Sequence, residues 1–91
     1  MTSSNDTTHD SPSTAMAVRQ RFGELEPLQE HFLSRLLHLT TLRHDALGRQ
    51  PRDEAAVKLL SKAIYATYLD CVGVNIGDQA QALMDPSLHQ A

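Results

Sequence analysis

Apolar residues recur every three or four positions in two long stretches of the chain, which is the spacing of one face of an α-helix. In the first stretch they are Leu25, Leu28, Phe32, Leu36 and Leu39. In the second they are Val57, Leu60, Ile64, Tyr68 and Cys71. Both series step by 3, 4, 4 and 3 residues, so the sequence predicts two amphipathic helices.

Start and stop signals place these two helices at residues 27–47 and 52–74. Pro27 suits the first turn of a helix, where its missing N–H costs nothing, and Gly48 can end a helix in the left-handed conformation. A short turn follows, and Pro51 opens a second set of starting signals. Because so few residues join the two helices, they are expected to lie antiparallel as a helical hairpin.

The apolar pattern of the second helix runs on beyond residue 74. The same spacing is repeated by Leu69, Val72, Ile76, Ala80 and Leu83. The helix can therefore continue to residue 84, with Gly73 and Gly77 at a close helix contact. It can also break at Asn75-Ile76-Gly77, with Asp78 capping a short third helix that ends at Met84. We favour the continuous helix, because each interior glycine costs it only about 1 kcal/mol relative to alanine.

The two ends of the chain differ from its middle. Residues 1–13 hold seven serines and threonines and no large apolar side chain after the first residue. Such a segment cannot offset the entropy lost on ordering, so a disordered polar tail is predicted. A short helix is predicted over residues 14–22, and residues 86–91 are expected to be loose. The chain then has a single helical domain at residues 14–85.

Both long helices carry more apolar surface than one hairpin can bury. The apolar arc of the first spans roughly 200°, about twice the stripe that faces one neighbour. On the second, apolar side chains point in all directions after Ala63. We therefore expect an all-α fold in which the hairpin, with its short flanking helix, completes a four-helix bundle as a homodimer. The predicted interface comprises Phe32, Leu33, Leu36, Leu37, Leu60, Ile64, Tyr68, Leu69, Val72 and Ile76.

Composition and charge narrow the classes of partner. The chain has 91 residues, of which 21% are charged, and a formal net charge of −3. It lacks the broad positive field that drives nucleic-acid binding, although four basic residues lie on or near the second helix: Arg49, Arg52, Lys58 and Lys62. An RNA-binding four-helix bundle is therefore the third hypothesis. Charges interrupt every long apolar stretch, so no membrane span is predicted.

The compartment is predicted from the cysteine count and the first residues. One cysteine cannot form an internal disulfide, and the N-terminal residues resemble no secretory signal. A cytoplasmic setting is expected.

Asp70 is the one charge in the second half of the second helix. A buried carboxylate would have a raised pKa, and such groups often mark functional sites. Asp70 can instead emerge at the edge of the bundle, or pair with Arg35 or Arg43 of the first helix. If the bundle binds a small molecule or cofactor, the predicted site lies around Asp70, Tyr65, Tyr68 and Arg35.

The remaining candidates for chemistry are one cysteine and three histidines. Cys71 lies on the core stripe, where a free cysteine usually behaves as a small apolar residue. His31 and His38 lie about 10 Å apart along the helix axis, too far for one metal ion. His44 would make assembly pH-dependent if it were buried in an interface. No catalytic residue, metal site or cofactor is predicted.

These features favour a small non-enzymatic interaction protein, acting as an adaptor, assembly factor or regulator, that binds another protein through an apolar helix face. The alternative is a small-molecule or cofactor-binding helical bundle, with or without enzymatic activity, whose site lies around Asp70. A closed core with Asp70 at its rim would support the first hypothesis. A cavity in which Asp70 and Arg35 converge would support the second.

Overall fold

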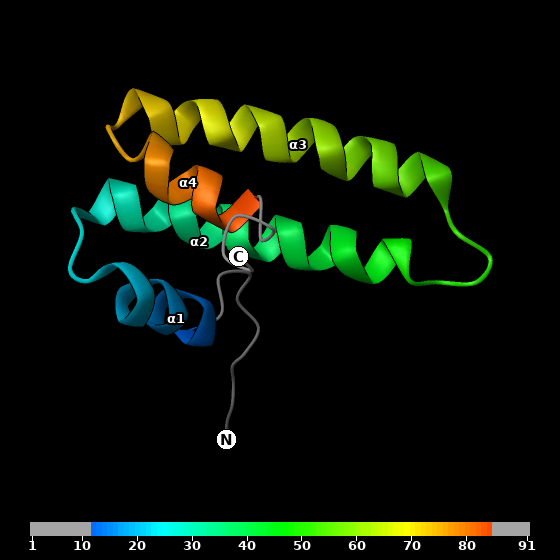
Figure 1. Ribbon diagram of the computed structural model, residues 1–91, viewed down its shortest axis with the longest axis horizontal. Helices are drawn as coiled ribbons and strands as arrows, with labels where there is room; N and C mark the ends of the chain where they lie inside the picture. The colour runs from blue at the N-terminus through cyan, green and yellow to red at the C-terminus, as the bar shows by residue number, and fades with distance from the viewer. Residues whose placement is uncertain (1–11, 85–91) are drawn as a thin grey trace, which may run out of the picture.

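The computed structural model describes residues 12–84, and over that range it contains helices and no strand (Figure 1). The helices are α1 (Pro12–Phe22), α2 (Pro27–Leu47), α3 (Glu54–Gly73) and α4 (Gly77–Met84). The prediction of an all-α fold is confirmed. The predicted loose C-terminus and all but the last two residues of the predicted polar tail lie outside the described residues; α1 includes those two.

Local sequence fixes where the two long helices begin. At the start of α2, the Gln29 side chain accepts a hydrogen bond from the Glu26 N–H at 3.0 Å, within a reciprocal capping box. At the start of α3, Asp53 Oδ1 accepts from the Ala56 N–H at 3.1 Å. Asp53 is therefore the residue before the helix, and α3 begins two residues later than the sequence analysis placed it.

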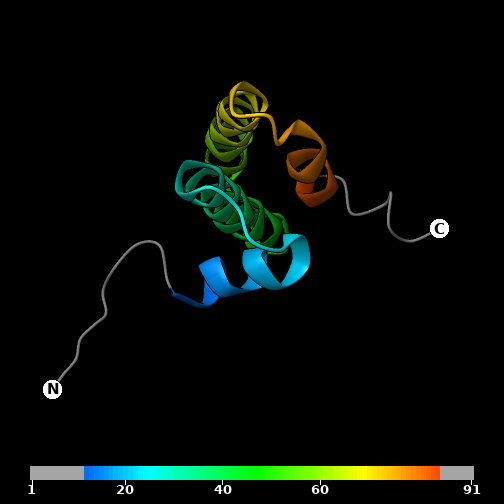
Figure 2. The same ribbon diagram turned by 90° about the vertical axis from the view of Figure 1, so that its left-hand side faces the viewer.

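The two long helices lie antiparallel and side by side, and α2 is the central element (Figures 1 and 2). Helix α3 packs on one side of α2 and α1 on the opposite side, while α4 contacts both α2 and α3. An ion pair between the exposed Arg19 Nε and the partly buried Glu30 Oε2, 2.7 Å apart, links α1 to α2. Within one chain, α2 therefore has three helical neighbours and α3 has two.

The chain breaks its helix between α3 and α4, so the continuous helix favoured from the sequence is not formed. Asn75 has a φ of 67°, in the left-handed region that a continuing α-helix cannot contain. The Ile76 N–H donates to the Cys71 carbonyl at 3.0 Å, and Gln29 Nε2 donates to the Val74 carbonyl at 2.9 Å. The first bond closes the turn on the end of α3, and the second holds the turn against the first turn of α2.

Burial is the physical reason for the break. The turn folds α4 back along α2, which places Ile76, Ala80 and Leu83 in the core at 8% exposure or less. A straight continuation of α3 would extend beyond the start of α2 and leave these side chains in water. The apolar area buried by folding back outweighs the hydrogen bonds of one continuous helix.

The glycines near this turn do not make the close helix contact that was predicted. A methyl group on Gly73 would meet no atom within 4 Å, so the surface there is open. A methyl group on Gly77 would lie 3.1 Å from Val72 Cγ2, which is a contact inside the turn. No second helix approaches Gly73 in the described chain.

The core lies where all four helices meet. Its buried apolar members are Val18, Leu33, Leu36, Ile64, Cys71, Ile76, Ala80 and Leu83. Every helix contributes at least one of them. The side of α3 that faces away from α2 takes no part in this core, and it remains in solvent.

Candidate functional site

The solvent side of α3 carries a group of apolar side chains that nothing in the described chain covers. Leu59, Tyr65, Leu69 and Val72 are 67%, 60%, 48% and 46% exposed. The small residues Ala66 and Gly73 lie among them and are exposed as well. We call these six residues the outer face of α3.

Helical spacing explains why these residues lie together. The buried residues of α3, Ile64, Thr67 and Cys71, recur at intervals of three and four and face the core. The Thr67 hydroxyl donates to the Ala63 carbonyl at 2.8 Å, which satisfies this polar group inside the helix. Tyr65, Leu69 and Val72 follow the same intervals about half a turn away, so they point outward. The α3 helix is therefore apolar on both sides, with one side packed and the other open.

Two opposite charges lie among the residues of the outer face. Lys62 and Asp70 are both exposed, and they stand four positions before and four positions after Ala66. The Asp70 side chain forms no hydrogen bond or ion pair with any residue of the described chain. Neither of the predicted pairings of Asp70, with Arg35 or with Arg43, is formed.

The four residues predicted to surround a small-molecule site are not gathered around a cavity. Asp70, Tyr65 and Arg35 are exposed on the surfaces of their helices, and Tyr68 is partly buried. The rings of Tyr65 and Tyr68 lie 6.4 Å apart along one side of α3. None of the four lines the cavity between the helices.

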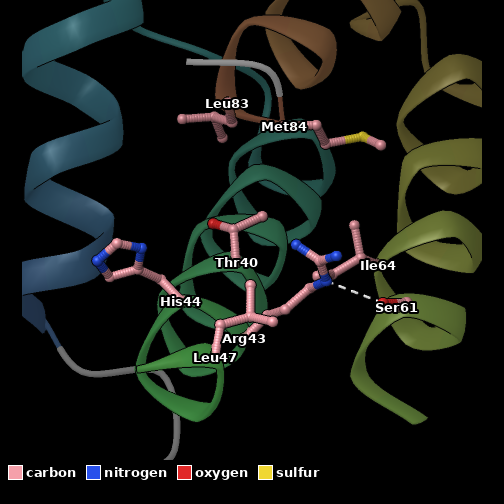
Figure 3. Close-up of a pocket in the computed structure, with 8 residues that line it drawn as sticks. All are labelled: Thr40, Arg43, His44, Leu47, Ser61, Ile64, Leu83 and Met84. Carbon is pink, nitrogen blue, oxygen red and sulfur yellow. Dashed lines mark hydrogen bonds between the residues drawn. The ribbon is translucent and has the colours of Figure 1, made fainter. Parts of the chain in front are cut away.

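That cavity has a volume of about 330 Å³ and opens between α2, α3 and the end of α4 (Figure 3). It is lined by Thr40, Arg43, His44, Leu47, Ser61, Ile64, Leu83 and Met84. Arg43 reaches across from α2 and its Nε donates to Ser61 Oγ of α3 at 2.8 Å (Figure 3). No acidic side chain is among the lining residues, so the half-buried guanidinium keeps unused N–H donors toward the cavity.

Sequence reasoning did not find this cavity, because one of its walls depends on the break at Asn75. Leu83 and Met84 reach the space beside Arg43 only when α4 folds back along α2. The sequence signal for this break is Asn75, which tolerates the left-handed backbone conformation and lies between Gly73 and Gly77.

Cys71 is fully buried in the core and is not available as a nucleophile. Burial in apolar surroundings, together with the smaller effect of the nearby negative charge of Asp70, raises the pKa of the Cys71 thiol to about 11. At neutral pH the group is a protonated thiol that packs as a small apolar side chain.

The three histidines of α2 do not converge. His31, His38 and His44 are all exposed, and the His31 ring lies 5.4 Å from the ring of its neighbour Phe32. His44 lies at the edge of the cavity (Figure 3). Within residues 12–84, no three side chains of the metal-binding types come close enough to hold an ion.

The ten predicted interface residues fall into three groups in the single chain. Leu33, Leu36, Ile64 and Ile76 are buried in the chain's own core. Phe32, Leu37, Leu60 and Tyr68 are partly buried. Leu69 and Val72 are exposed and belong to the outer face of α3, to which the structure adds Leu59 and Tyr65.

The chain matches no protein-family model, no curated protein and no solved structure with which it was compared. Among the described helices, none has the length and apolar character needed to cross a membrane. The surfaces of the molecule itself are therefore the basis for inferring what it binds.

Proposed function

We propose that this protein is a small non-enzymatic helical interaction protein, acting as an adaptor, assembly factor or regulator, that binds another protein through the outer face of α3. The observation that carries this proposal is the exposed apolar group on a helix whose opposite side is already packed. Single exposed leucines are ordinary, but neighbouring large apolar side chains on one surface usually mark a protein-binding site.

The spacing of the apolar side chains suits recognition by another helix or a groove. Tyr65, Leu69 and Val72 stand at positions i, i+4 and i+7 of α3, which is the arrangement of anchor residues in helix-in-groove binding. Fully burying one such side chain is worth about 1.5–3 kcal/mol. These side chains are already about half covered, so each can contribute roughly 1 kcal/mol on binding. Together they support weak, reversible association.

A homodimer that forms a four-helix bundle is one form of this proposal. Leu33, Leu36 and Ile64 are already buried inside each chain, so self-association would use the outer face of α3. The two α3 helices would then lie in the middle and the two α2 helices outside them. Such a bundle is layered, because each α2–α3 pair keeps its own core.

A photoreactive amino acid at position 65 tests the proposed function in the native cell. We expect a cross-link from this position to a protein, and we expect Leu69→Gln to abolish it by removing apolar area from the centre of the face. The matched control is Leu28→Gln on α2, since Leu28 is similarly exposed at 53% and lies on another helix. A cross-link that survives Leu69→Gln, or that is lost equally with Leu28→Gln, would contradict the proposal.

A small-molecule-binding bundle is the second candidate, and the lining of the cavity is the observation that favours it. A guanidinium without an acidic neighbour, next to apolar walls, suits a small carboxylate with an aliphatic body. Millimolar carboxylates of about four to eight carbons should raise the midpoint of thermal unfolding of the wild type. Arg43→Gln should remove this rise, whereas Arg35→Gln, at an exposed position of the same helix, should retain it. An equal rise in all three proteins would exclude a site at Arg43.

RNA binding, the third hypothesis, gains no supporting observation. Among the four basic residues on or near α3, Arg52 is already in an exposed ion pair, with its Nη1 3.7 Å from Glu54 Oε2. Lys62 lies beside an apolar face, where its stem can cover apolar surface and leave the ammonium in water.

A further inference from the structure

We infer that the partner of the outer face of α3 is a second copy of this chain, packed antiparallel across a two-fold axis at Ala66, so that Lys62 of each copy pairs with Asp70 of the other. This inference rests on the proposed function and names the partner and the geometry of the same surface.

Charge along α3 carries the inference. In an antiparallel helix pair related by a two-fold axis, each residue lies level with the residue equally far from the axis on the other side. Lys62 is four positions before Ala66 and Asp70 is four positions after it, so each lies about 6 Å from the axis along the helix. Four residues rotate an α-helix by about 400°, which is about 40° more than a full turn. The side chains of Lys62 and Asp70 therefore point toward the partner, each within about 40° of the direction of Ala66. Two crossed ion pairs result.

Side-chain size along α3 agrees with the same axis. Leu59 is seven positions before Ala66 and Gly73 is seven positions after it. Leu59 is the most exposed of the large apolar residues at 67%, and the surface at Gly73 is open. In the dimer, Leu59 of each copy therefore lies on the glycine of the other. The small side chain of Ala66 at the axis allows the helices to approach to about 10 Å, where the two copies of this position come into contact.

The other arrangements of two α3 helices are less favourable. A parallel pair would place Lys62 against Lys62 and Asp70 against Asp70, and like charges at close range oppose association. In the antiparallel pair, Leu69 lies level with the partly buried Ala63 of the other copy. Tyr65 and Val72 lie about 100–120° from Ala66 around the helix, so in this dimer they flank the contact and do not anchor its centre. One face of a 20-residue helix buries less than the ~800 Å² per partner of a stable complex, so the dimer should be weak and concentration-dependent.

Charge reversal followed by mixing tests the register. At low ionic strength, Lys62→Glu alone and Asp70→Lys alone should each raise the dissociation constant about tenfold or more, because each makes two like-charge contacts per dimer. An equimolar mixture of the two variants should form a heterodimer nearly as tight as the wild-type dimer, because both crossed pairs become attractive again. The double variant Lys62→Glu/Asp70→Lys should recover self-association in the same way. Sedimentation equilibrium measures all four samples.

Lys58→Glu is the matched control. Lys58 is exposed on the same helix, but the position equally far beyond Ala66 is Val74, which lies past the end of α3. Its reversal should leave the dissociation constant within about twofold of the wild type. Recovery on mixing also separates a lost contact from a variant that fails to fold, since a misfolded chain cannot be rescued by its counterpart.

Cross-linking at the axis gives an independent measurement. With oxidised glutathione, Ala66→Cys should yield a disulfide-linked dimer, because the two copies of this position face each other across the axis. Ala55→Cys should yield no such dimer, because Ala55 is exposed at the N-terminal end of α3, eleven positions from the axis. The buried Cys71 thiol does not compete in this reaction.

The outcomes separate this inference from the proposed function. A wild type that stays monomeric up to millimolar concentration would overturn the inference, while the cross-link from position 65 to a different protein would still uphold the function. A dimer whose dissociation constant is unchanged by Lys62→Glu and by Asp70→Lys would overturn the proposed register. Heterodimer recovery on mixing, together with the disulfide at position 66, would support the inference.

Discussion

Single residues of α3 show how one helix can serve a core and a surface at once. Cys71 and Asp70 are adjacent in the sequence, yet the first is fully buried and the second is exposed. The 100° turn between neighbouring helical residues separates them. Because of this separation, Asp70 can act on the thiol through its charge while its own side chain remains available to a partner.

The Cys71 thiol should react slowly and at unusually high pH. Its pKa of about 11, compared with an ordinary value of 9.0, leaves about one fiftieth of the usual thiolate at pH 9. We therefore expect alkylation by iodoacetamide at pH 9 to be at least about 50-fold slower in the native protein than in urea. Equal rates in the two states would contradict burial of this residue.

The same thiol should make stability depend on pH above neutrality. The pKa of Cys71 is raised in the folded protein, so its contribution to stability is complete below pH 9 and declines as pH rises from 9 to about 11. Other groups titrate in this range, so the wild type has to be compared with Cys71→Ala. The difference between their unfolding free energies should shrink across this pH interval in favour of the alanine variant.

At the scale of elements, the turn between α3 and α4 decides the fold. Its conformation depends on Asn75 at a φ of 67°, and its position depends on the Gln29 side chain and the burial of Ile76. This turn brings Leu83 and Met84 of α4 to the rim of the cavity, and it ends α3 at Gly73, where the surface is open. In a continuous helix, α4 would not line the cavity and α3 would not end at Gly73.

Substitution of Asn75 should separate residues that tolerate this conformation from those that do not. Asn75→Gly is expected to change the unfolding free energy by less than about 0.5 kcal/mol, because glycine adopts a positive φ without strain. Asn75→Val should destabilise the protein by about 1–3 kcal/mol, since a β-branched residue is strained there. Urea unfolding measures both variants, and equal stability of the two would argue against the break at this residue.

At the scale of the whole molecule, the helices within one chain already enclose a core around α2, and α3 lies at its edge (Figure 2). Helices α1, α3 and α4 cover part of the apolar excess of α2, and Leu28 and Leu42 remain 53% and 39% exposed. Among the described helices, α3 leaves the most large apolar side chains in solvent: Leu59, Tyr65, Leu69 and Val72. Folding and association are therefore expected to be separate events.

Dilution distinguishes this arrangement from an obligate dimer. The far-ultraviolet circular dichroism of the wild type should stay constant on dilution while its mass falls to that of the monomer, because the core lies within each chain. Lys62→Glu should likewise remain helical as a monomer. Loss of helical signal in parallel with dissociation would show that the chain folds only as a dimer.

The apolar spacing and the capping residues, by themselves, determined that this protein is helical and that it carries more apolar surface than two helices can bury. These signals act within a few residues, through backbone hydrogen bonds and the 3.6-residue period. The sequence did not decide where the surplus would be covered. Ile76, Ala80 and Leu83 fit a straight helix and a folded-back one equally well, and only packing against α2 selected the second. Tertiary structure therefore buried part of the apolar excess of α2, placed Asp70 in solvent, and left the outer face of α3 exposed.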